Sequence, residues 1–211
     1  MDSHYEMFEV VEKIREEDHR FYVGDHWDLM GKLQFDFLRE HGLLPRHTLM
    51  DIGCGCLRGG VKYLDYLDNN RYYGLDVNKK LILKGVDLEL SDEQREKITD
   101  ETFIVSDKFE FDERSFDYAI AFSLFTHLSE NKIKLCLRNL KADKFYATFF
   151  IVDEQIDTMT QVDGVETFSY TDPYHYTREE ITNMGKSSGW NVEFIGEFGH
   201  IRGQQMVKFY E

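Results

Sequence analysis

One short stretch of the sequence combines residue types that could bind a small ligand. The run TLMDIGCGCLRGG, residues 48–60, places Asp51 in an apolar strand-like segment and Gly53, Gly55 and Gly59 after it. Glycine is needed where the backbone turns with positive φ or lets a ligand come close. A strand, a glycine turn and a helix in this order are typical of nucleotide sites. A carboxylate such as Asp51 suits a ligand's ammonium group better than a phosphate.

The glycine spacing argues against a dinucleotide site. That fingerprint is G-x-G-x-x-G/A, and Arg58 occupies the place of its third glycine. The alternative to a ligand site is a glycine-rich turn that binds nothing.

A second acidic residue follows at the right distance. Asp76 ends the predicted strand 71–75, about 20 residues after the glycine turn, where an acidic side chain accepts hydrogen bonds from ribose hydroxyls. The alternative role is a turn aspartate that caps the helix beginning near Asn78.

His127 is the candidate for proton chemistry. It follows the apolar segment 116–122, a buried strand of the kind found inside parallel sheets. Histidine can take a proton from a hydroxyl near neutral pH. In the alternative interpretation, His127 only bonds a loop carbonyl.

These motifs resemble a known family. D-x-G-x-G-x-x-x-G resembles motif I of the class I S-adenosylmethionine-dependent methyltransferases, and the run FLREHGLLPRHTLMDIGCGCLRGG resembles a bacterial small-molecule methyltransferase group. The resemblance implies S-adenosyl-L-methionine as the cofactor. It further implies that Asp107 contacts the adenine, unless its segment is only a solvated loop. The predicted cofactor-binding residues are Asp51, Gly53, Gly55, Asp76, Asp107, Phe109 and Ser123.

The resemblance extends to the acceptor side. SLFTHL resembles an S-x-x-x-H-L segment whose histidine lines the acceptor site, and His200 to Gln204 resembles an H-x-R-G-Q turn. His127 and His200 are therefore the predicted catalytic residues. Arg202 either holds an acidic group of the acceptor or pairs with the acidic surface. The aromatic residues form the acceptor wall or ordinary packing, and they are Tyr22, Trp27, Tyr174 and Tyr176.

The missing N/D-P-P-Y/F motif, a signature of amino methyltransferases, favours a hydroxyl acceptor. The resemblance suggests a small molecule such as a sugar or a cell-surface glycan precursor. The alternatives are an N-methyltransferase, and a non-catalytic relative that binds the cofactor or a partner protein.

Composition excludes several classes of function. The 211 residues are 42% hydrophobic and 15% aromatic, as in globular proteins. A net charge of -15, from 25 basic and 40 acidic residues, disfavours nucleic acid as a partner. Cys54, Cys56 and Cys136 lack the further ligands that a metal site needs. No apolar run is long enough to insert into a membrane, so a cytoplasmic location is expected.

The expected architecture is a single α/β domain over residues 1–211. It has a Rossmann-like, seven-stranded, mostly parallel sheet with an antiparallel last strand. Helices at 4–20 and 25–41 form an N-terminal cap within residues 1–42, and a first crossover helix spans 57–67. The long irregular segment 153–176 is an acceptor-side insertion or lid. The sequence leaves the oligomeric state open.

Overall fold

The computed structural model describes residues 19–24 and 26–211, which fall into two compact units. The N-terminal unit contains the described residues up to Asp107 together with Phe116–Tyr118. The C-terminal unit contains residues 108–115 and 119–211. Strand β4, Phe116–Ala121, is therefore divided between them.

Parallel strands form the sheet of the N-terminal unit. β1 (Leu49–Ile52) pairs with β2 (Tyr72–Asp76), and β2 pairs with β3 (Phe103–Val105), both in parallel. The order is β3-β2-β1, with β4 beside β1. Because the carboxyl ends of parallel strands meet at one edge, the turns after β1, β2 and β3 lie there together.

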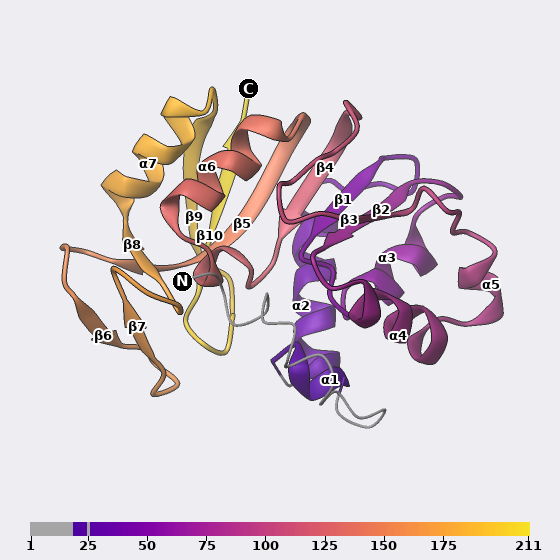
Figure 1. Cartoon of the computed structure of the whole chain (residues 1–211), viewed down its shortest axis with the longest axis horizontal. Helices are drawn as coiled ribbons and strands as arrows, with labels where there is room; N and C mark the ends of the chain where they lie inside the picture. The colour runs from indigo at the N-terminus through magenta and orange to yellow at the C-terminus, as the bar shows by residue number, and fades with distance from the viewer. Residues whose placement is uncertain (1–18, 25) are drawn as a thin grey trace. The chain divides into compact units, whose positions relative to one another are not determined.

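Among the described residues, five α-helices belong to this unit, drawn from indigo to magenta in Figure 1. Local signals define several ends: Asn78 caps the fourth helix, and Ser91 and Gln94 form a capping box on the fifth. The described helices are α1 (His19–Tyr22), α2 (Trp27–Glu40), α3 (Gly60–Tyr66), α4 (Lys79–Glu89) and α5 (Asp92–Arg95).

Two helix predictions need comment. The crossover helix predicted at 57–67 begins only at Gly60, because Leu57 has a φ of 69° and extends the glycine turn. Residues 4–18 of the first predicted helix lie outside the described residues, whereas the prediction at 25–41 matches α2.

The C-terminal unit contains an antiparallel last strand. β10 (Gln205–Tyr210) runs antiparallel to both β5 (Ala142–Val152) and β9 (Asn191–Glu197), in the order β4-β5-β10-β9. Helix α6 (Glu130–Asn139) contacts α7 (Arg178–Ser187), and α7 also lies against β9 (Figure 1). A short 3-10 helix, η4 (Phe125–His127), follows β4.

The segment 153–176 is more regular than predicted. It contains the hairpin of β6 (Thr158–Thr160) and β7 (Glu166–Phe168), and β8 (His175–Thr177) pairs in parallel with β5. Buried His175 of β8 connects the hairpin to the sheet. Its ring contacts Thr167 Oγ1 of β7 at 2.9 Å and the Ile156 carbonyl, before β6, at 2.8 Å. The prediction of an irregular segment was wrong, since long-range pairing orders it.

The predicted fold class is confirmed: the sheet is mixed and mostly parallel, and its last strand is antiparallel. Strand β8 is additional to the seven predicted strands. The organisation of 1–211 as a single domain stays a prediction. None of the helices among the described residues is long and apolar enough to span a membrane.

Helix α4 lies directly on the glycine turn. A Cβ added at Gly85 would approach the Cys56 carbonyl oxygen to 2.5 Å, which is closer than real Cβ atoms come to backbone. Glycine at this position therefore lets the helix and the turn touch.

We expect Gly85→Ala to destabilise the protein by about 1–3 kcal/mol, because overpacking outweighs the better helix propensity of alanine. Urea denaturation would measure the loss as a lower transition midpoint. Lys80→Ala, an exposed change in the same helix, is the control. An unchanged midpoint for Gly85→Ala would contradict the tight contact.

Candidate functional site

The glycine turn after β1 is fixed by bonds to the neighbouring strand. Gly53 and Gly55 have φ values of 77° and 54°. The Gly53 amide donates to the Leu75 carbonyl at 2.7 Å, and the Gly55 amide donates to Asp76 Oδ2 at 2.9 Å. The turn is thus anchored on β2, the strand that the sequence predicts to carry the second acidic residue.

Space above the turn requires glycine as well. A Cβ added at Gly55 would lie 2.9 Å from Val23 Cγ1, and one at Gly59 would lie 2.7 Å from the Gln34 side chain. Both contacts come from the segment before β1. Glycine at both positions therefore leaves room for the Val23 and Gln34 side chains against the turn.

Asp51 is a buried carboxylate. It is 3% exposed, and its Oδ2 accepts a hydrogen bond of 3.0 Å from the Tyr72 hydroxyl. Burial raises the pKa of Asp51 to about 7, and the Tyr72 bond and the Arg58 charge only partly oppose this. A carboxylate with so little neutralisation favours a cationic ligand.

Asp76, the last residue of β2, accepts hydrogen bonds from the turns around it. Its Oδ1 accepts from the Asn78 amide at 2.8 Å, while the α4 cap itself is Asn78, whose Oδ1 accepts from Leu81 at 3.1 Å. Burial raises the pKa of Asp76, although three backbone bonds work against it. Asn78 Nδ2 is buried and finds no partner among the described residues, which leaves one donor for a ligand.

These features fit a ligand with an ammonium group and hydroxyls. Gly53 and Gly55 place no side chain of their own on the turn, Asp51 and Asp76 supply acceptors, and Asn78 supplies a donor. Asp107, at the same edge after β3, is exposed.

His127 has an acidic partner in the C-terminal unit. Its Nδ1 lies 2.6 Å from Asp172 Oδ1, with side chains 17% and 14% exposed. Since a carboxylate only accepts, Nδ1 donates the proton, and in the neutral ring Nε2 is the nitrogen that can accept one. The Tyr174 amide, two residues beyond Asp172, bonds the Thr126 carbonyl at 2.6 Å, so both partners are held by backbone.

Sequence reasoning missed Asp172. It lies 45 residues from His127, inside the segment that was expected to be irregular. The only signal was its place at the start of DPYHY, a segment singled out for its aromatic residues.

His200 is placed in a separate hydrogen-bond network. Its Nδ1 accepts from the Arg202 amide at 3.2 Å, and its Nε2 lies 3.1 Å from Ser123 Oγ. Ser123 Oγ in turn donates to Gln204 Oε1 at 3.2 Å. Neutral His200 thus carries its proton on Nε2 and fixes Ser123, whose φ is 57°.

The remaining predicted residues occupy defined surroundings. Arg202 Nε lies 3.6 Å from Asp163 Oδ2 in the β6–β7 hairpin. Tyr176 is buried, stacks on Tyr174, and donates to the Leu128 carbonyl at 2.7 Å. Phe109 is buried in the C-terminal unit with a φ of 55°.

The N-terminal unit holds the two aromatic residues predicted before the glycine turn. The Arg20 guanidinium lies over the Trp27 ring, with its Cζ 4.9 Å from the ring centroid. Burial and the charge of Asp76 raise the pKa of Tyr22.

Comparison with known proteins agrees with the sequence motifs. Residues 50–142 match the family model described as a methyltransferase domain. No curated protein sequence matches the chain.

Solved structures share the fold along nearly the whole chain. Magnesium protoporphyrin IX methyltransferase from Synechocystis PCC 6803, solved with bound S-adenosylmethionine, is 15% identical, with 92% of this chain and 90% of that chain covered and a TM-score of 0.62. An amino pentose methyltransferase of Micromonospora echinaspora, involved in calicheamicin biosynthesis, is 13% identical, with coverages of 94% and 98% and a TM-score of 0.61. The methyltransferase domain of bacterial CtHen1-CN is 18% identical, with coverages of 93% and 100% and a TM-score of 0.60. The resemblance to class I methyltransferases is confirmed.

The His127–Asp172 geometry makes a prediction that needs no substrate. In the neutral form of the ring, nitrogen-15 NMR should show His127 protonated on Nδ1. Asp172→Asn should shift the ring toward a mixture of tautomers. An unchanged tautomer in the variant would contradict the pairing, and His175, whose ring has other partners, is the internal reference.

Proposed function

We propose that this chain is a class I S-adenosylmethionine-dependent methyltransferase and that it methylates a hydroxyl group of a small molecule. The observation that carries the hydroxyl acceptor is the pairing of His127 with Asp172 at 2.6 Å. A sugar-like acceptor is the class we favour, since one relative of similar fold is an amino pentose methyltransferase. The acidic balance, with a net charge of -15, supports neither nucleic acid nor an anionic membrane surface as a partner.

The N-terminal unit supplies the residues that would hold the cofactor. Asp51 receives its ammonium group, the backbone at Gly53 and Gly55 allows close approach, and Asp76 accepts from the ribose hydroxyls. Asn78 adds the donor left over in the turn. Asp107, Phe109 and Ser123 are assigned to the same cofactor by their match to the family pattern.

When bound, S-adenosylmethionine supplies an electrophilic methyl group on a sulfonium, which is already a good leaving group. The protein then has two tasks, to align the acceptor and to take its proton. His127 Nε2 takes the hydroxyl proton. Asp172 keeps Nδ1 protonated and stabilises the positive imidazolium that forms.

The other residues shape the acceptor site in this proposal. Tyr22, Trp27, Tyr174 and Tyr176 line it, and Arg202 holds an acidic group of the acceptor. His200 serves as a second acid-base residue. Its bonds to Ser123 and Arg202 would have to rearrange for that role, so His127 is assigned the first proton transfer.

Cofactor binding should depend on the charge of Asp51. Because the pKa of Asp51 is about 7, its carboxylate is charged above that pH and neutral below it. We expect affinity for S-adenosylhomocysteine, measured by calorimetry, to fall by up to about tenfold per pH unit below 7. Asp51→Asn should bind weakly without this dependence.

Two results would contradict the cofactor assignment. Failure of the wild-type protein to bind either S-adenosylmethionine or S-adenosylhomocysteine would rule out the proposed cofactor. Binding of NADH in their place would favour a dinucleotide site. If the pH dependence of affinity persisted in Asp51→Asn, Asp51 would not be the residue that binds the ammonium group.

His127→Ala tests the chemistry. We expect turnover, followed by release of S-adenosylhomocysteine with an acceptor from a screen of sugars and phenols, to fall by about 100-fold to 10,000-fold. Cofactor affinity should not change, because His127 touches the acceptor's proton. Turnover should fall less in Asp172→Asn than in His127→Ala. Equal loss of affinity and turnover in His127→Ala would show that it is not a base.

A further inference from the structure

Residues 19–23 of the N-terminal unit, here called the strap, lie on the glycine turn. The His19 carbonyl accepts a hydrogen bond of 3.3 Å from Cys56 Sγ, and the Val23 carbonyl accepts one of 2.8 Å from Arg58 Nη1. The Val23 side chain fills the space above Gly55. The strap is thus fastened along the turn that is proposed to cradle the cofactor.

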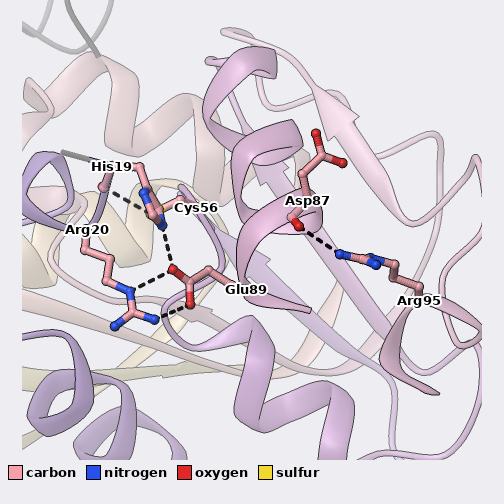
Figure 2. Close-up of polar contacts among 6 residues, drawn as sticks. All are labelled: His19, Arg20, Cys56, Asp87, Glu89 and Arg95. Atoms are coloured by element: carbon pink, nitrogen blue, oxygen red, sulfur yellow. Dashed lines mark hydrogen bonds and ion pairs between the residues drawn. The ribbon is translucent and has the colours of Figure 1, made fainter. Parts of the chain in front are cut away.

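The start of the strap is fastened to a helix far along the sequence. His19 Nε2 donates to Glu89 Oε1 at 2.5 Å, and Arg20 donates to both carboxylate oxygens of Glu89, at 2.7 and 2.6 Å. Figure 2 shows the three side chains converging, with Cys56 beside them. The Arg20 guanidinium also covers Trp27 at the start of α2. These three side chains, His19, Arg20 and Glu89, are here called the latch.

Glu89 is in an unfavourable place for a carboxylate. It is the last residue of α4, where the helix dipole opposes negative charge, and its side chain is only 6% exposed. Burial by itself would raise its pKa, yet the bonds from Arg20 and His19 outweigh this and lower it. The strap therefore stabilises a charge that the rest of the unit does not favour.

The latch can open without leaving a buried charge. The Arg20 side chain is 52% exposed, so water replaces its bonds when the strap lifts, and Glu89 gains solvent at the same step. The net cost of opening is accordingly smaller than three charge-assisted bonds suggest.

We propose that the strap closes over the cofactor site and that its latch to Glu89 sets how fast the cofactor enters and leaves. This inference rests on the proposed cofactor. Val23 lies against Gly55, and Tyr22 is near enough to Asp76 for its charge to act on the phenol. Gly55 and Asp76, two of the proposed cofactor contacts, are therefore covered by the strap, and release requires the strap to move.

Glu89→Gln removes the charge and keeps the shape of the latch. The matched control is Asp87→Asn, two residues earlier in the same helix, whose carboxylate points away from the latch in Figure 2. We expect stopped-flow dissociation of S-adenosylhomocysteine to be about tenfold or more faster in Glu89→Gln and within about twofold of wild type in the control. Arg20→Gln should change in the same direction.

Hydrogen exchange of the ligand-free protein supplies an independent readout. Amides of residues 20–24 should exchange faster in Glu89→Gln than in Asp87→Asn. Faster exchange with unchanged dissociation would show that the latch holds the strap but the strap does not gate the cofactor, which overturns the proposal. Unchanged exchange overturns the latch itself. Absence of binding by wild type would instead overturn the proposed cofactor, and the gating role with it.

Discussion

The parallel pairing of β1 with β2 is the constraint on which the proposed cofactor site depends. It brings the Leu75 carbonyl and the Asp76 carboxylate to the amides of Gly53 and Gly55. A turn with two positive φ values would otherwise be one conformation among many for a glycine-rich segment, and glycine loses the most entropy when it is fixed. Strand pairing and the Asp76 bond together fix the turn in one conformation.

The same arrangement buries a carboxylate whose charge is poorly stabilised. Asp51 is almost fully buried, and its pKa near 7 shows how poorly the surroundings stabilise its charge. Tyr72 gives one hydrogen bond, and Arg58 gives a partial charge balance. A cationic ligand would recover this cost on binding, so the stability that the fold gives up at Asp51 becomes affinity. In a chain of net charge -15, such a site also attracts cations from a distance.

The sequence predicted what is local. The strands predicted at 71–75 and 116–122 followed from short patterns of residues, and the structure contains them as β2 and β4. The helix after the glycine turn begins later than predicted. Leu57 has a positive φ, which the sequence does not indicate because leucine rarely adopts one. The β6–β7 hairpin and β8 were missed, since their order depends on contacts such as those of His175 with distant backbone.

The division between the predictable and the unpredictable follows the chemistry. Residues around Asp51 and Asp76 are set by a turn and two adjacent strands, so a motif is enough to find them. His127 was predicted as a site residue from its place after a strand, but its partner Asp172 comes from the segment 153–176. The insertion also contributes Asp163, which contacts Arg202 beside His200. A change in the segment 153–176 would alter the partners of His127 and Arg202 without altering the turn that is proposed to hold the cofactor.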